Sequence, residues 1–277
     1  MGAEEIVKEV LNSEVVKEVY KDGVKSTVEA VGNIVALPFQ AIDAALSPAK
    51  LWVDEKKYNY KKTLELLSKK MKNVSEENIV QPENYVAVPA LQQIAYCFDS
   101  DELRNMYANL LSSSMQKDKK WEVHPGFVDI IKQLSPDEAK IIRKMCSIKR
   151  VAVVTLNATN NEHAQICVIS NYSLIADKAN CENPSNVAMY INNLCRLGLL
   201  NNEIGISYLT NEKLYEEIYN LDYIKKEKDN IINRKDGFNI PAFDKGYIEL
   251  TDFGKSFCKV CVYDLIINVD FDKNNHI

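Results

Sequence analysis

Few residues of this chain have the types and spacing that chemistry requires. The sequence holds three histidines in 277 residues, which disfavours a histidine-based metal site or hydrolase. The phosphate-binding glycine loop, the zinc-protease helix and the serine nucleophile elbow are all missing from it. His124 has the pKa range of a general base, but no nucleophile motif lies near it, so we interpret it as a helix-start residue. The sequence therefore predicts no catalytic residue, no metal ligand and no cofactor.

Cysteines are the other reactive groups, and their odd number and irregular spacing predict buried, reduced thiols in a cytosolic protein. Cys258 and Cys261 form a C-x-x-C pair, which is typical of a redox centre or of half a zinc site. No second pair completes such a site, and Phe257 and Val262 flank the pair. We therefore interpret it as part of an apolar helical stripe. The seven cysteines are Cys97, Cys146, Cys167, Cys181, Cys195, Cys258 and Cys261.

The segment 56–72 has the most distinctive charge pattern. Seven lysines there oppose one acid, Glu65, a local charge of +6, whereas residues 1–55 hold five lysines and ten acids, a local charge of −5. The total charge of −5 argues against a general nucleic-acid coat protein, but it hides this contrast. The candidate contacts to an anionic surface are Lys56, Lys57, Lys61, Lys62, Lys69 and Lys70.

Three interpretations of this lysine-rich segment stay open. Its lysines are solvated or pair with the acidic residues 4–22, or they bind an anionic membrane or phosphate backbone, or they form an interface with a partner protein. Leu64, Leu67 and Met71 are predicted to make the apolar face of its helix. If the segment binds a membrane, the Ala-rich stretch 23–47 would supply the apolar insertion.

No transmembrane helix is expected. The longest uncharged apolar run, 30–42, has 13 residues, and a spanning helix needs about 20. The first residues are acidic and lack an apolar signal region. We therefore expect a cytoplasmic protein, at most peripheral to the inner membrane.

Residues 1–133 are predicted to form an all-helical domain. Amphipathic spacing predicts a helix over 4–20, and the Ala-rich stretch 23–47 predicts a kinked helix or two short ones. A polar connection over 73–85 is expected to precede a short helix that opens at Pro89. Further helices are predicted after the cap residue Ser100 and over the apolar spacing that follows Phe127.

Residues 134–277 are predicted to form a winged-helix-like domain. Ser135 to Glu138 has the sequence of a capping box, and two β-prone runs (151–156 and 166–169) then predict a hairpin. Two helices, an extended run (204–209), a charged helix (212–232) and a closing strand (247–250) follow. This order resembles a winged helix with an insertion of about 35 residues between the wing strands. The predicted fold class is therefore α+β, mainly α.

The helix over 185–197 corresponds to the recognition helix of such a domain. Val187, Ile191 and Leu194 make its buried stripe. A DNA-binding helix usually has several cationic residues that contact phosphates, and this helix has one arginine. A protein contact or a structural role is therefore favoured. Its candidate partner or nucleic-acid contacts are Met189, Asn192, Asn193 and Arg196.

Three blocks in the middle of the chain resemble the Abi-alpha family of bacterial abortive-infection proteins. They are SDELRNMYANLL (100–111), VHPGFV (123–128) and IKQLSPDEA (131–139), and they cover a small part of the chain. The resemblance implies a cytosolic bacterial or prophage-encoded protein that arrests or kills the phage-infected cell. It transfers no catalytic residue.

The expected function is phage defence of the abortive-infection type through binding to a protein or a membrane surface. The expected partners are a phage or host protein trigger, an anionic membrane surface and a second copy of the chain. A winged-helix nucleic-acid-binding regulator is the alternative. A hydrolase or nuclease without a recognisable motif has the least support.

Overall fold

The computed structural model describes residues 58–59, 61–94 and 100–263 and separates into two compact units. Unit 1 comprises residues 1–133 and 260–277, and unit 2 comprises residues 134–259. The predicted helices over 4–20 and 23–47, together with Lys56, Lys57 and Cys97, lie outside the described residues. Helix is abundant and the strands form one antiparallel sheet, which confirms the mainly α, α+β class.

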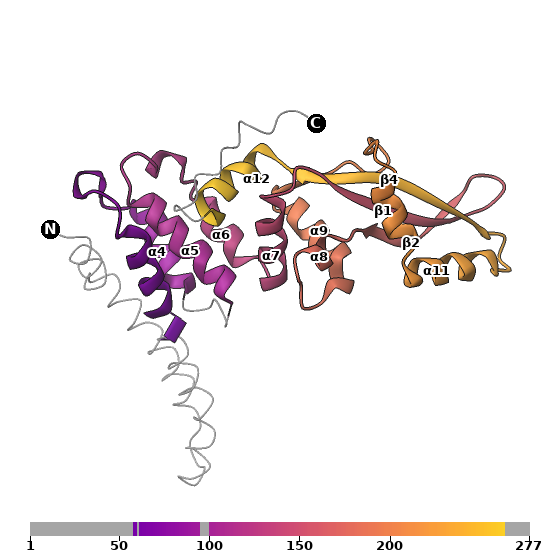
Figure 1. Cartoon of the computed structure of the whole chain (residues 1–277), viewed down its shortest axis with the longest axis horizontal. Coiled ribbons are helices and arrows are strands. Elements are labelled where there is room, and N and C mark those ends of the chain that lie inside the picture. The colour runs from indigo at the N-terminus through magenta and orange to yellow at the C-terminus, as the bar shows by residue number, and fades with distance from the viewer. Residues whose placement is uncertain (1–57, 60, 95–99, 264–277) are drawn as a thin grey trace, which may run out of the picture. The chain divides into compact units, whose positions relative to one another are not determined.

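Unit 1 consists of helices in its described part (Figure 1). A helix covers residues 61–71 and includes 58–59, and α4, α5 and α6 then pack against one another. A single antiparallel bridge, Ile79 to Gln116, ties the connection after the first helix to the end of α5. The elements are η1 (Glu76–Asn78), α4 (Asn84–Ile94), α5 (Asp101–Ser114), η2 (Lys120–Glu122) and α6 (Gly126–Lys132).

Helix α5 is the centre of unit 1. Ser100 caps it as predicted, because its Oγ accepts a hydrogen bond from the Leu103 N–H at 3.3 Å. Eleven of its 14 residues are buried, so the helix is enclosed on most sides and not along one stripe. Polar residues are therefore buried with the apolar ones, and each needs a partner inside the unit.

Pro89 lies inside α4, so the prediction that a helix opens at this proline is wrong. The helix begins five residues earlier, at Asn84, within the stretch predicted as a loop. A proline inside a helix removes one backbone hydrogen bond and leaves the carbonyl four residues earlier without its usual donor. That carbonyl belongs to Tyr85, in the first turn of the helix.

Unit 2 combines short helices with a four-stranded antiparallel sheet of order β2-β1-β4-β3. The predicted hairpin is confirmed and is longer than expected, and the last strand is β4, of 11 residues. The elements are α7 (Pro136–Met145), β1 (Val151–Thr159), β2 (Gln165–Tyr172), α8 (Ile175–Lys178), η3 (Pro184–Asn186), α9 (Val187–Arg196), β3 (Leu200–Asn202), α10 (Lys213–Tyr219), α11 (Asp222–Ile232), β4 (Ile240–Leu250), α12 (Asp252–Phe257) and the π-helical η4 (Cys258–Val262), which runs into unit 1.

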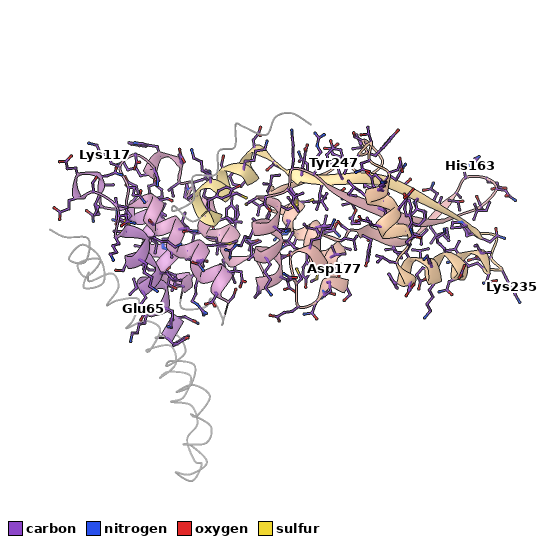
Figure 2. The ribbon with its side chains drawn as sticks, in the orientation of Figure 1. Glu65, Lys117, His163, Asp177, Lys235 and Tyr247 are labelled. Carbon is purple, nitrogen blue, oxygen red and sulfur yellow. The ribbon has the colours of Figure 1, made fainter. Side chains whose placement is uncertain are left out.

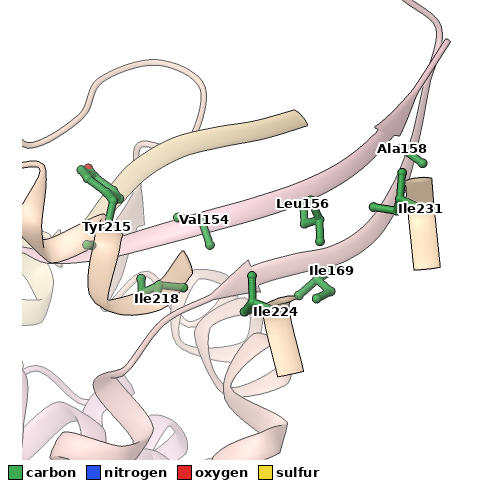
Figure 3. Close-up of a cluster of buried hydrophobic side chains, with 9 residues drawn as sticks. Val154, Leu156, Ala158, Ile169, Tyr215, Ile218, Ile224 and Ile231 are labelled. Carbon is green, nitrogen blue, oxygen red and sulfur yellow. The ribbon is translucent and has the colours of Figure 1, made fainter. Parts of the chain in front are cut away.

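One face of this sheet is covered by α10 and α11. Alternate residues of β1, Val154, Leu156 and Ala158, point toward Ile218, Ile224 and Ile231 of the two helices (Figure 3). This period of two is what places one set of strand side chains in a core. The segment between the last two strands therefore forms part of the core of unit 2 and is more than a surface loop.

Two element boundaries in this segment differ from the prediction. The extended run over 204–209 is wrong, because β3 ends at Asn202 and Gly205 turns the chain with a φ of +71°. The single helix over 212–232 is also wrong, because Leu221 is extended (φ −63°, ψ 136°) and separates α10 from α11. Both breaks are main-chain turns, which a charged, helix-prone composition does not reveal.

The turn between α9 and β3 contacts the start of α12. The hydroxyl of Thr251 donates to the Gly198 carbonyl at 2.6 Å and accepts from the Gly254 N–H at 2.7 Å. A Cβ on Gly254 would lie 2.1 Å from the carbonyl oxygen of Leu199, so only glycine fits there. This contact explains why the chain has the sequence Leu-Gly-Leu-Leu at 197–200 and Leu-Thr-x-x-Gly at 250–254.

Candidate functional surfaces

The helix over 58–71 carries a cationic face. Its buried residues, Asn59, Thr63, Leu67 and Met71, recur every four positions and define the side that packs against unit 1. Of the six lysines predicted to contact an anionic surface, Lys61, Lys62 and Lys69 lie on the other side. Lys56 and Lys57 lie outside the described residues. The exposed charged and aromatic residues of that other side are Tyr58, Lys61, Lys62, Glu65 and Lys69, and Lys72 is exposed in the turn directly after the helix. We call these six residues the cationic face (Figure 2 labels Glu65).

Helix geometry brings these side chains together. At 100° per residue, Tyr58, Lys61, Lys62, Glu65 and Lys69 fall within a sector of about 100°. Glu65 is the one acid among them, and it lies 3.6 Å from Lys62. The described residues provide no ion-pair partner for Lys61, Lys69 or Lys72. Lys70 is half-buried and lies off this face.

Polar contacts with α5 fix the orientation of this helix. The buried guanidinium of Arg104 donates to Asn59 Oδ1 at 2.8 Å and to Asp101 Oδ1 at 2.7 Å. Thr63 donates back to the Asn59 carbonyl at 2.9 Å. The prediction of a buried apolar face is confirmed for Leu67 and Met71. The other two buried positions on this side of the helix are polar. Asn and Thr are usually exposed, so hydrophobic spacing could not reveal them.

A second polar cluster surrounds the first turn of α7 in unit 2. The capping box is confirmed: Ser135 Oγ accepts from the Glu138 N–H, and Glu138 Oε2 accepts from the Ser135 N–H at 2.7 Å. Asp137, beside it, is buried and accepts from the N–H groups of Glu182 and Asn183 at 2.8 and 3.0 Å. The two carboxylates therefore hold the helix start and also the loop that leads to α9.

Asp137 also reaches α9 directly. The Tyr190 hydroxyl donates to Asp137 Oδ2 at 2.9 Å, and Lys140 lies 3.4 Å from Oδ1. Burial alone would raise the pKa of Asp137, but the hydrogen bonds from the N–H groups of Glu182 and Asn183, from Tyr190 and from Lys140 together outweigh it, so the pKa is lowered. Burial, together with the bond to this carboxylate, raises the pKa of Tyr190 to about 12. Both groups therefore stay in one protonation state near neutral pH and serve packing.

The candidate contacts on α9 are largely engaged inside unit 2. Arg196 donates to Asn193 Oδ1 at 2.7 and 3.0 Å, and Asn193 Nδ2 donates to Glu138 Oε1 at 2.8 Å. Asn192 Oδ1 accepts from Asn171 of β2 at 2.8 Å. Met189 is 58% exposed and is the member of the set that projects most freely. The predicted buried stripe of this helix, Val187, Ile191 and Leu194, is confirmed.

His124 lies at the start of α6. Its Nδ1 accepts from the Gly126 N–H at 3.1 Å, and its ring lies 5.7 Å from that of Phe127. The side chain is exposed and supports the local turn, as the sequence predicts.

The thiols differ in their surroundings. Cys258 and Cys261 are buried beside Phe257, which confirms an apolar role for the C-x-x-C pair. The expectation of buried thiols is wrong for Cys167, which is exposed on β2, and Cys146, Cys181 and Cys195 are only half-buried. Burial raises the pKa of Cys181 to about 11, which disfavours its reactive thiolate.

The described residues include neither a metal-binding cluster nor a helix that could span a membrane. Over 58–59, 61–94 and 100–263, no group of three or more His, Cys, Asp and Glu residues is arranged to hold a metal ion. In the same part of the chain, no helix has both the length and the apolar character needed to cross a membrane.

Comparison with known proteins assigns the chain to a family. The sequence model of the family described as abortive infection alpha matches residues 55–261, about three quarters of the chain. The chain belongs to this family. The match runs from the cationic helix of unit 1 to η4, so it includes both polar clusters of the two units.

Other comparisons add little. No curated protein matches the chain. A solved structure of an uncharacterized protein from the hydrocarbon-degrading marine bacterium Alcanivorax borkumensis SK2 is similar at 15% identity and a TM-score of 0.36. The match covers 52% of this chain and 94% of that one. A similarity of this size supports no conclusion about fold or function.

The sequence blocks that resemble the abortive infection alpha family correspond to structural positions. Block 100–111 is the cap and buried body of α5, and block 123–128 is the His124 turn with the start of α6. Block 131–139 contains the capping box and Asp137. These family-like residues therefore hold helices in place, which explains why the resemblance supplies no catalytic group.

Replacing Asp137 with Asn should destabilise unit 2. The carboxylate accepts four hydrogen bonds, from the N–H groups of Glu182 and Asn183, from the Tyr190 hydroxyl and from Lys140. The amide cannot accept all of them, and hydrogen bonds to charged groups contribute about 1.5–3 kcal/mol. Because the folded-state pKa is lowered, the carboxylate stabilises the fold above its usual pKa and loses this effect as the pH falls through the folded value. Urea unfolding should show a loss of about 3 kcal/mol at pH 7 and a smaller difference below about pH 3.8.

The matched control is Asp229→Asn, at an exposed position of α11. It changes charge equally and should leave the free energy of unfolding within about 0.5 kcal/mol of wild type. Equal stabilities for the two variants at pH 7 would contradict the role given to Asp137.

Proposed function

We propose that this member of the abortive infection alpha family is a phage-defence protein that acts by binding an anionic membrane surface through its cationic face. The observation that carries the proposal is the gathering of Lys61, Lys62 and Lys69 on one exposed side of a helix whose other side is buried, with Lys72 exposed in the turn that follows. Family membership supports the defence role, and the surface supplies the mode of action.

The electrostatics of this face suit an anionic membrane. Each lysine close to an anionic leaflet contributes about 1 kcal/mol, so the four of the cationic face contribute about 4 kcal/mol. That is roughly a thousandfold in affinity. Tyr58, which is 49% exposed beside Lys62, adds an amphipathic ring of the kind enriched at membrane interfaces. This attraction is screened by salt, so the binding should be salt-dependent.

The polar groups of the described chain support binding over catalysis. Asp137 and Tyr190, whose pKa values are shifted, have all their contacts within the packing of unit 2. An activated nucleophile needs a neighbouring base that a third group orients. A hydrolase or nuclease therefore has no observation in its favour.

Liposome co-sedimentation tests the membrane step. The full chain should bind vesicles containing phosphatidylserine or phosphatidylglycerol at low salt and bind neutral vesicles weakly. Replacing Lys61, Lys62, Lys69 and Lys72 with Gln removes four charges without touching the buried side, and should lower the partition coefficient at least about a hundredfold.

The control variant carries the same charge change on unit 2, at the exposed Lys149, Lys213, Lys225 and Lys226. It should keep most of the affinity, because those lysines lie off the cationic face. Equal losses in the two variants, or no binding by the wild type at low salt, would contradict the proposal.

A winged-helix nucleic-acid binder is the second candidate. The observation that favours it is the order α7, β1, α8, α9, β3, β4, together with the pairing of β1 and β3 on either side of β4. This is the element order of a winged helix with a hairpin strand and a helical segment inserted. The internal hydrogen bonds of Asn192, Asn193 and Arg196 argue against DNA reading.

A gel-shift titration over salt separates the two candidates. We expect no shift of duplex DNA at physiological salt, and the same result for Arg196→Ala. If Arg196 instead read a base, the wild type would bind with a steep salt dependence, and the substitution would cost about 1–3 kcal/mol. That outcome would establish the second candidate.

A further inference from the structure

The sheet of unit 2 has two free edges that differ in their protection. One is the outer side of β2, the first strand in the order β2-β1-β4-β3. The other is the part of β4 over 240–244, beyond the stretch bonded to β3 and to residues 203–205. An exposed strand edge offers unpaired N–H and C=O groups to any extended chain, so proteins usually protect it.

The β4 edge has this protection. Pro241 lacks an N–H group to donate, and Asp244 places a charge on the strand. The β2 edge has neither a proline nor a charged residue. Its exposed side chains, Gln165, Ile166, Cys167 and Ser170, are all neutral. The free stretch ends at Asn171, which has a φ of +50° and is bonded to Asn192.

We propose that the β2 edge is the interface at which two copies of this chain pair, antiparallel, into one continuous sheet. This inference goes beyond the proposed function and does not depend on it. Two copies related by a two-fold axis present the same strand to each other, so one contact satisfies both edges. Since the β4 edge is protected, the assembly stops at two copies.

The neutrality of β2 favours a second copy as the occupant. A charged strand would bury its charge against Gln165, Ile166 and Ser170 without a counter-ion, whereas a copy of β2 brings none. The strand also contains a bulge, because its register against β1 skips Val168. A bulge increases local twist, and a second β2 has the same bulge and therefore the same twist.

The covered face of the sheet adds apolar area to this interface. Ile166 lies opposite Ala158, so both side chains are on the face covered by α11. Tyr223 of α11 lies 6.2 Å from Tyr172 of β2 and is 53% exposed. A strand added beside β2 would cover Ile166 and Tyr223 as well as satisfy the backbone groups.

A matched pair of substitutions tests this interface in the full chain. Ile166 and Ile240 are isoleucines of similar exposure, 38% and 43%, on the two opposite edges. Ile166→Lys places like charges near the two-fold axis and should raise the dimer dissociation constant at least about tenfold, whereas Ile240→Lys should leave it unchanged. The masses of wild type and both variants are measured by light scattering over a range of concentrations, with circular dichroism to confirm folding.

A thiol cross-link provides a second readout that does not depend on folding of the lysine variants. Two-fold pairing brings the exposed Cys167 of both copies to the same face, within reach of a short bis-maleimide. The cross-linked dimer should disappear in Cys167→Ser and persist in Cys146→Ser. A wild type that is monomeric throughout, equal effects of the two lysine substitutions, or no product that depends on Cys167 would each overturn the proposal.

Discussion

The organisation of unit 2 depends on the carboxylates at the start of α7. Glu138 satisfies the helix cap and accepts from Asn193 of α9, while Asp137 satisfies two N–H groups of the loop before α9 and the hydroxyl of Tyr190. Acids in the first turn are favoured by the helix dipole as well. One turn of helix therefore fixes a loop and a second helix, and α9 in turn contacts β2 and β3.

This arrangement explains why the candidate recognition helix has little freedom to read DNA. Side chains that face outward on α9 already form hydrogen bonds within unit 2: Asn193 donates to Glu138, and Arg196 donates to Asn193. In unit 1, buried polar contacts also fix a helix, but they leave the side chains on its other side exposed. Arg104 and Asn59 bury their polar groups to orient a helix, and Lys61, Lys62 and Lys69 are exposed on its outer side.

Local sequence signals predicted local structure well. The capping box at Ser135, the cap at Ser100, the hairpin and the buried stripe of α9 each depend on residues close in the sequence, and each is confirmed. The bonds of Asp137 to residues 45 and 46 positions away were not predictable, because no periodicity reports a contact over that distance. The buried Asn59 and Thr63 were missed for a related reason. Polar residues are usually exposed. The burial of these two is favourable because Asn59 accepts from Arg104 of another helix and Thr63 donates to the Asn59 carbonyl.

The lysine-rich segment was predictable from the sequence. That its exposed lysines lie on one side follows from which side of the helix is buried. The central claim is that this side is needed for defence, and phage infection tests it most directly. Cells that express the wild type should give fewer plaques and should die or stop growing when most are infected. Cells with Lys61, Lys62, Lys69 and Lys72 replaced by Gln, at equal protein level, should lose both effects. Fewer plaques with surviving infected cells, or full protection by the substituted protein, would contradict the account.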